Sequence, residues 1–333
     1  MAKTSKSEAP ALTPDSEALE RFRRSIDPLG GADQSVGLAV SGGPDSLALL
    51  LLAAAARPGK IEAATVDHGL RADSAAEAEM VAALCAKLGV PHRTLKAEWD
   101  EKPETAIQER ARAKRYALLS EWADERGLKA LATAHHLDDQ AETFFMRLMR
   151  GAGVRGLGAM RPVSRAPAGR VPLVRPLLGW RRSELEAVSS AAGVTPAQDP
   201  SNADEKFERV RVRAALAEKD WVDPAAIAAS AGYLAEADAA LGWTTAQVWK
   251  RAVRRNGEQL LFQPRGVPRE IRRRVVARAI ARLAKEGAAG GLRGREVEQL
   301  LAALAAGRKA TLRGVLCSGG KQWRFERAPA RAA

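Results

Sequence analysis

The chain has 333 residues, with 53 Lys and Arg against 40 Asp and Glu, which gives a formal net charge of +13. At about 150 residues per domain, this length predicts two domains. A hydrophobic content of 46% excludes disorder over most of the chain, because it is enough to build a sizeable core. The two cysteines, Cys85 and Cys317, exclude a disulfide framework and argue against a zinc site or an iron–sulfur cluster held by this chain alone.

The charge is unevenly distributed along the chain. Residues 1–150 contain 20 basic and 23 acidic side chains, whereas residues 151–333 contain 33 and 17. A nearly neutral first half and a strongly basic second half predict chemistry in the first and capture of a polyanion in the second. A codon bias towards arginine is the alternative explanation of the basic excess.

No segment of the sequence has the features of a transmembrane helix or of a signal peptide. The first 20 residues are polar, and the longest apolar run, residues 47–56, is too short to cross a bilayer. We therefore expect a soluble, cytoplasmic protein without membrane contact, whose residues 1–17 form a disordered leader.

Strands and helices are predicted to alternate from residue 35 onwards. Apolar segments predict strands at 35–40, 61–66, 91–97 and 128–134, and helices at 47–56, 74–88, 105–126 and 135–150. This alternation indicates an α/β fold, a parallel sheet flanked by helices. Loops 41–46, 67–73 and 135–142 each follow a strand, so we expect them to converge in one crevice at the carboxyl edge of the sheet.

Glycine and proline are frequent from Gly151 to Trp180, and this composition predicts loops and short strands. Helices are then predicted at 183–192, 209–219, 224–256, 268–286 and 295–306, and a final hairpin pairs 310–316 with 322–326. We place the α/β domain at residues 18–217 and a basic, mainly helical region at 218–333.

The loop Ser41-Gly42-Gly43-Pro44-Asp45-Ser46 lies between a predicted strand and a predicted helix. Glycines let backbone N–H groups approach phosphate oxygens, and the helix N-terminus adds partial positive charge. Asp45 can hold Mg²⁺ together with phosphate oxygens. A capped strand-to-helix turn without a ligand is the alternative interpretation.

Two histidines and three carboxylates occur at the entry to the fourth predicted helix: His135, His136, Asp138, Asp139 and Glu142. Asp138 and Glu142 are four residues apart and share a helix face. Zinc would usually require a cysteine or a third spaced histidine, so these carboxylates better suit Mg²⁺ or an incoming amine. N-capping is the alternative role of Asp138 or Asp139.

These segments together resemble a known family. Ser41–Ser46 resembles the PP-loop of the ATP pyrophosphatase superfamily, whose fold is of the adenine nucleotide alpha hydrolase type. Asp67-His68-Gly69-Leu70-Arg71 and the segment AHHLDDQAET at 134–143 are similar to motifs of the tRNA(Ile)-lysidine synthases. Further matching segments occur in the family's order at 150–158, 175–178 and 199–202, so the resemblance covers residues 35–215.

The resemblance implies an ATP-dependent carbon–nitrogen ligase. ATP adenylates the C2 oxygen of the wobble cytidine in the isoleucine tRNA with a CAU anticodon, and the ε-amine of free L-lysine then displaces AMP to give lysidine. The implied cofactors are ATP and Mg²⁺, the implied partners are this tRNA and L-lysine, and a homodimer is left open.

The resemblance also implies roles for individual residues. ATP is bound by Ser41, Gly42, Gly43, Pro44, Asp45, Ser46, His68, Arg71 and His135. Asp45 and Asp138 share Mg²⁺, and Asp138 or Glu142 positions the lysine amine. Arg112, with Arg209 or Arg211, meets substrate phosphate or the activated base. Val210 stands where the family usually has asparagine, and a solvated helix face is the alternative role of Arg112.

The second half of the chain carries basic clusters at 250–255 and 269–274, interleaved with Trp243, Trp249 and Phe262. This pattern favours RNA binding, with core packing as the alternative for each tryptophan. A tRNA thiolase of the same superfamily is one rival function, but it would usually need a cysteine pair. A nucleotide-regulated RNA-binding protein is the other, and it would not need the carboxylates beside the loop.

Overall fold

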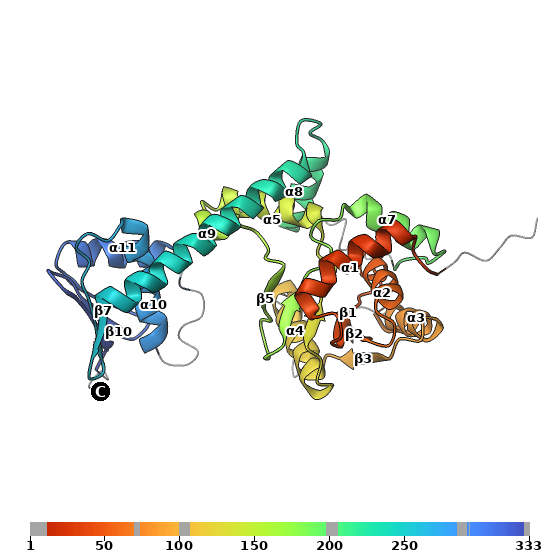
Figure 1. Ribbon diagram of the computed structural model, residues 1–333, viewed down its shortest axis with the longest axis horizontal. Helices are drawn as coiled ribbons and strands as arrows, with labels where there is room; N and C mark the ends of the chain where they lie inside the picture. Colours follow the sequence, from red (N-terminus) through yellow and green to blue (C-terminus); the bar gives the residue numbers. More distant parts are fainter. Residues whose placement is uncertain are drawn as a thin grey trace, which may run out of the picture. The chain divides into compact units, whose positions relative to one another are not determined.

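The computed structural model describes residues 12–69, 74–99, 107–197, 206–284, 292 and 294–329. The chain divides into two compact units, Met1–Ala235 and Glu236–Ala333 (Figure 1). The boundary falls inside helix α9 (Pro224–Ala252), whereas the sequence predicted it at residue 217. None of the described helices has both the length and the apolar character needed to cross a membrane.

The first unit is built on a six-stranded sheet in the order β3-β2-β1-β4-β6-β5. The strands are β1 (Val36–Ala39), β2 (Ile61–Asp67), β3 (His92–Lys96), β4 (Ala130–Ala132), β5 (Val163–Arg165) and β6 (Pro172–Val174). All neighbouring strands pair in parallel except β5, which is antiparallel to β6 at one edge. The predicted parallel sheet is therefore confirmed.

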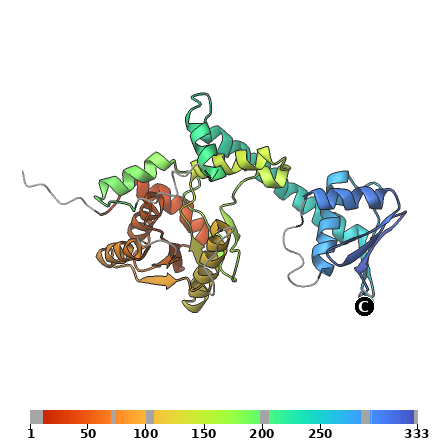
Figure 2. The same ribbon diagram turned by 180° about the vertical axis from the view of Figure 1, so that it is seen from behind.

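Helices cover both faces of this sheet (Figures 1 and 2). One core joins the sheet to α1 (Ser16–Gly30), α2 (Pro44–Ala56), α3 (Ser74–Lys87) and α7 (Arg182–Ala191), and a second core joins it to α4 (Ile107–Glu125). Strand β1 shows the alternation, because Val36 and Leu38 face the first core and Gly37 faces the second. The remaining helices of this unit are α5 (Leu137–Met149), α6 (Val154–Leu157) and α8 (Glu208–Ala217), and both α6 and α8 pack against α5.

Helix α1 was not predicted from the sequence. The Asp15 carboxylate accepts a hydrogen bond from the Ala18 N–H at 2.8 Å, and Leu12 packs against the first core. The predicted leader at 1–17 is therefore wrong at its C-terminal end, because a capping carboxylate and an apolar anchor hold that end in the fold.

Gly37 is expected to tolerate no larger side chain. A Cβ at this position would lie 2.8 Å from atoms of both Trp122 and Leu128, which are buried. Gly37→Ala should therefore lower the free energy of unfolding by about 1–3 kcal/mol in urea denaturation. Gly179→Ala is the matched control, since its Cβ would meet no described atom within 4 Å. Equal losses in both variants would contradict this expectation.

The second unit combines helices with an antiparallel sheet. Its sheet has the order β7-β8-β11-β10-β9, and α10 (Arg269–Leu283), α11 (Gly294–Ala305) and the end of α9 share a core with it. The strands are β7 (Val253–Asn256), β8 (Gln259–Phe262), β9 (Lys309–Leu312), β10 (Val315–Ser318) and β11 (Trp323–Arg327). The helical character predicted for this region is confirmed, and the five-stranded sheet is an addition to it.

Two details of this sheet differ from the sequence prediction. The helix expected to reach residue 256 ends at Ala252, and a two-residue turn at Gly257-Glu258 joins β7 to β8. Gly257 has a φ of 56°, which glycine adopts readily in such turns. The strand expected at 310–316 is split into β9 and β10 by a turn at Arg313-Gly314. In this turn φ is 51° for Arg313 and 74° for Gly314.

Candidate active site

The predicted phosphate loop joins β1 to α2. Gly42 has a φ of 85°, and a Cβ there would lie 3.3 Å from Met80 Cε, so the position favours glycine. The Ser46 hydroxyl donates to the Gly43 carbonyl at 2.9 Å and accepts from the Ser41 N–H at 3.1 Å. The buried Ser46 side chain therefore stabilises the conformation of the loop through these two hydrogen bonds. Ser41, in contrast, is exposed beside the N-terminus of α2.

Helix α7 holds two of the predicted loops. The Ser189 hydroxyl donates to the Pro44 carbonyl at 3.0 Å in the phosphate loop. At the other end of α7, the Arg182 N–H donates to Asp138 Oδ2 at 2.8 Å, and Arg181 Nη2 lies 3.2 Å from Asp138 Oδ1. The phosphate loop and the start of α5 are thus attached to the same helix.

Three carboxylates, Asp45, Asp138 and Asp139, surround the buried ring of His136. Glu142 is linked to Asp139 through Arg209, and we call the four acidic residues the carboxylate cluster. His136 Nε2 lies 3.5 Å from Asp45 Oδ2 and 3.6 Å from Asp139 Oδ2, while its Nδ1 lies 3.5 Å from Asp138 Oδ2. The convergence of loops 41–46 and 135–142 is therefore confirmed. The imidazole ring lies between Asp45 and Asp138, an arrangement that the sequence did not predict.

The cluster changes the pKa of both His136 and Asp138. Burial lowers the pKa of His136, but hydrogen bonding to Asp138 and Asp45 and the charge of Asp139 raise it to about 10. Burial raises the pKa of Asp138, but His136, the Arg182 N–H and the Arg181 guanidinium lower it to about 2. At neutral pH, a cationic imidazole therefore stabilises the anionic form of the carboxylate beside it.

Glu142 connects α5 to α8. Its side chain is only 3% exposed, with Oε2 accepting from Arg209 Nε at 2.7 Å and Oε1 accepting from Arg213 Nε at 2.6 Å. Arg209 Nη2 also lies 3.5 Å from Asp139 Oδ1. Both Glu142 oxygens are therefore engaged by arginines of α8, so Glu142 anchors this helix to α5, and its role toward the lysine amine stays a prediction.

Arg209 and Arg211, the predicted alternatives for contacting substrate phosphate or the activated base, lie in different surroundings. Arg211 is exposed and donates to the Lys206 carbonyl at 3.0 Å. Residues two apart on a helix project from different sides, whereas residues four apart share a face. Arg213 therefore joins Arg209 at Glu142.

A second group of charges surrounds His135, and we call Arg112, Arg115, Arg175 and Arg209 the arginine group. Burial and the positive charges of this group lower the pKa of His135 well below its usual value, so the ring is neutral at pH 7. The ring is fixed by a 2.8 Å hydrogen bond between His135 Nδ1 and the Thr133 hydroxyl. Arg112 itself is exposed, with its guanidinium 5.1 Å from the centre of the Tyr116 ring. The group therefore places positive potential beside the carboxylate cluster.

The loop after β2 is described only in part. His68 is half-buried and its carbonyl accepts from Trp99 Nε1 at 2.8 Å. Arg71 and the predicted segment 199–202 lie outside the described residues.

Asp45 has the features of a Mg²⁺ ligand. Its Oδ1 is buried and has no hydrogen-bond partner among the described residues. Such an oxygen at a helix N-terminus suits a Mg²⁺ whose other ligands are phosphate oxygens and water. No three His, Cys, Asp or Glu side chains in the described part of the chain are arranged to hold a metal by themselves. The His136 ring lies between Asp45 and Asp138, and the sharing of Mg²⁺ by these two carboxylates stays a prediction.

Comparison with known proteins decides the family. The model of the PP-loop domain family matches residues 14–220. The tRNA(Ile)-lysidine synthase of Novosphingobium aromaticivorans is 48% identical over 94% of this chain and 95% of its own length. That of Zymomonas mobilis is 44% identical over 91% of both chains. This chain belongs to the tRNA(Ile)-lysidine synthase family. Members of the family are ATP-dependent ligases, so the chain is an enzyme.

The fold of this lysidine synthase family member is shared with other PP-loop enzymes. A U34-tRNA thiolase from Methanococcus maripaludis, solved with its 4Fe-4S cluster, superposes with a TM-score of 0.56 at 18% identity, over 66% of this chain and 79% of its own. In the present chain, Cys85 and Cys317 are buried in separate cores, and burial raises the pKa of each thiol to about 12. Neither cysteine is therefore available as a thiolate, and the rival thiolase function is not supported.

The sequence of this lysidine synthase family member did not predict the roles of three residues in the site. His136 was noted in its motif but given no role, Arg213 was noted only as one of the alternating arginines that add positive charge at the mouth of the site, and Arg181 was not considered. Spacing could have identified Arg213, since it is four residues from Arg209 in a predicted helix. Arg181 precedes the predicted helix at 183–192 without a local pattern, so it could be found only from the structure.

Proposed function

We propose that the chain ligates free L-lysine to C2 of the wobble cytidine of the CAU-anticodon isoleucine tRNA, through an adenylate, with release of pyrophosphate and AMP. The observation that carries this proposal is the 3.5 Å contact between Asp45 of the phosphate loop and His136 of the carboxylate cluster. It places a nucleotide-binding loop next to a group of anions that would attract an amine. The two relatives described above are both named tRNA(Ile)-lysidine synthase, which supports this proposal.

The phosphate loop is proposed to bind ATP. The N-terminus of α2 and the backbone of residues 41–46 stabilise phosphate oxygens, and Ser41 offers an exposed hydroxyl. Asp45 would hold Mg²⁺, which supplies neutralisation of the triphosphate and the departing pyrophosphate.

The carboxylate cluster is proposed to receive lysine. A group with a pKa of about 2 accepts a proton poorly at neutral pH, so Asp138 would act as a fixed negative charge for the lysine ε-amino group and not as a base. Glu142 would keep Arg209 at the border between the carboxylate cluster and the arginine group. Arg209 and Arg112 would then face the phosphate or the activated base.

The second unit is proposed to bind the tRNA. Residues 1–235 contain 32 basic and 32 acidic side chains, whereas residues 236–333 contain 21 and 8. The entire net charge of +13 therefore belongs to the second unit, which suits capture of a phosphate backbone. The homodimer left open by the sequence stays a prediction.

Mass spectrometry of the tRNA tests this function directly. After incubation of the purified protein with ATP, L-lysine and the isoleucine tRNA, one cytidine should gain the mass of lysine less one water. Omission of ATP or lysine should abolish the change, and sustained pyrophosphate release should require both lysine and tRNA, because lysine must consume the adenylate before the next turnover. Release that needs neither would refute the ligase function and favour another nucleotide-hydrolysing activity.

A further inference from the structure

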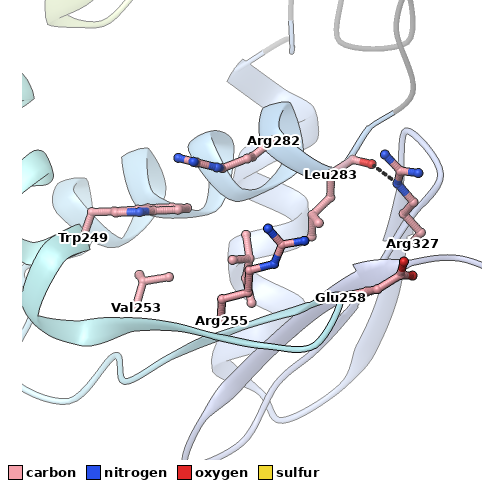
Figure 3. A pocket seen from close by; sticks show the side chains of 8 residues that line it. Trp249, Val253, Arg255, Glu258, Arg282, Leu283 and Arg327 are labelled. Atoms are coloured by element: carbon pink, nitrogen blue, oxygen red, sulfur yellow. Dashed lines mark hydrogen bonds between the residues drawn. The ribbon is translucent and has the colours of Figure 1, made fainter.

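A cavity of about 420 Å³ opens in the second unit, close to the C-terminal end of α10. Its apolar floor consists of Val253, Leu260 and Leu283, and Trp249 forms one wall (Figure 3). Leu260 is part of the core beneath, and Trp249 packs against that core. The cavity is therefore a continuation of the core that remains open to a ligand.

Three arginines and one carboxylate complete the cavity: Arg255, Arg282, Arg327 and Glu258. Arg255 pairs with Leu260 across the hairpin, so it projects from the sheet face that elsewhere carries the core. Arg327 Nε donates to the Leu283 carbonyl at 3.1 Å, and Arg255 Nε donates to the Gly257 carbonyl at 2.9 Å (Figure 3). No described carboxylate forms an ion pair with any of the three. Their positive charge is therefore available to an anionic ligand.

Trp249 is fixed in place before any ligand arrives. The Arg278 guanidinium lies 4.7 Å from the centre of its ring, and the indole is only half-buried. Aromatic rings beside guanidinium groups are typical of sites that stack an unpaired base and hold its phosphate. A cavity of several hundred Å³ is also large enough for one such group.

The other side of the same hairpin is basic as well. A second cavity there, of about 430 Å³, is lined by Arg251, Arg254 and Arg265. The alternation of side chains along β7 sends Arg254 to this side and Arg255 to the first cavity. No aromatic side chain is among the residues that line the second cavity, so it offers positive charge without a ring on which a base could stack. Arginines on both sides of one hairpin suit a polynucleotide that crosses it better than a single free nucleotide.

We propose that the cavity at Trp249 binds one unstacked nucleotide of the tRNA, with its base against Trp249 and its phosphates on Arg255, Arg282 and Arg327. The inference rests on the proposed function for the identity of the polyanion. All phosphate-loop and carboxylate-cluster residues belong to the first unit, so the nucleotide site proposed here is built from residues other than those proposed to carry the ligation.

Binding of the isoleucine tRNA by the full chain tests this site. Trp249→Leu should raise the Kd roughly 5- to 100-fold without changing its dependence on salt, because stacking involves no released counterion. Trp243→Leu is the matched control, since Trp243 lies on the same helix, is 67% exposed and does not line the cavity. Arg255→Gln alters an exposed side chain and should lower the slope of log Kd against log salt by about 0.7–0.9.

A double-mutant cycle separates the cavity from general basic attraction. Trp249→Leu and Arg255→Gln act on one nucleotide, so their combined effect should fall short of the product of the single effects. Trp249→Leu and Arg254→Gln should combine independently. Equal effects of Trp249→Leu and Trp243→Leu, or independent effects of Trp249→Leu and Arg255→Gln, would overturn the proposal.

Free nucleotides distinguish the source of the ligand. If AMP or CMP binds the wild type more tightly than the Trp249→Leu variant while the tRNA Kd is unchanged, the site takes a mononucleotide and the proposal is wrong. Lysine- and tRNA-dependent pyrophosphate release by the wild type reports on the ligase function separately, so either idea can fail alone.

Discussion

Replacing Glu142 with glutamine is expected to detach α8 from α5 and to reduce both stability and ligase activity. The carboxylate is buried and accepts from Arg209 and Arg213 at 2.7 and 2.6 Å. An amide would keep one acceptor oxygen, but it would remove the negative charge and place its NH2 group against the other guanidinium group. The two arginine side chains are 37% and 32% exposed, which lets water offset part of the loss. We expect a decrease of about 2–3 kcal/mol in the free energy of unfolding, below the range for fully buried pairs.

The companion variants show whether the loss comes from these contacts. Arg213→Gln should reproduce much of the effect, and the double variant Glu142→Gln/Arg213→Gln should lose less than the two single losses together, because the pair is removed as a unit. Arg211→Gln is the matched control on the same helix, since its side chain is exposed and donates to a backbone carbonyl. Urea denaturation and kcat/KM for lysine measure both consequences. A loss for Arg211→Gln as large as that for Arg213→Gln would contradict the arrangement.

The sheet of the first unit could be predicted because its signals are local. Buried apolar runs alternate with helices of ten or more residues, and each chemically unusual loop directly follows a strand. The hairpin β7–β8 escaped prediction because Arg254 and Arg255 suit a helix as well as a strand, and the preceding helix is long and regular. The dipeptide Asn256-Gly257 at the end of β7 was the available signal of a hairpin turn.

The site was only partly predictable, because its ion pairs depend on distant segments. Arg181 and Arg213 belong to the half of the sequence that carries the basic excess, yet they contact carboxylates of the α/β unit. Counting charge by halves therefore assigned to RNA binding some arginines that stabilise the site. Counting by structural unit corrects this, because the first unit is neutral and the second carries the whole +13.

Asp45→Asn is expected to remove activity without removing stability. The variant loses the charge that attracts Mg²⁺ to the phosphates, so lysine incorporation should fall at least about a hundredfold. The free energy of unfolding should change by less than about 1 kcal/mol, because the lost contact with His136 is offset by the removal of a buried charged oxygen without a described partner. This combination differs from the joint loss expected for Glu142→Gln, and it separates a ligand-binding carboxylate from an anchoring one.

Three measurements on the Asp45→Asn variant decide this. Lysine incorporation at saturating ATP and tRNA reports the chemistry, urea denaturation reports the fold, and the tRNA Kd should stay at the wild-type value because the net positive charge lies in the second unit. Asp124→Asn, which alters an exposed carboxylate on α4, should change none of them. Full activity of Asp45→Asn would exclude Asp45 as the metal-binding group, whereas a weakened fold would mean that the contact of Asp45 with His136 is structural, because an anchoring contact must lower stability when it is lost.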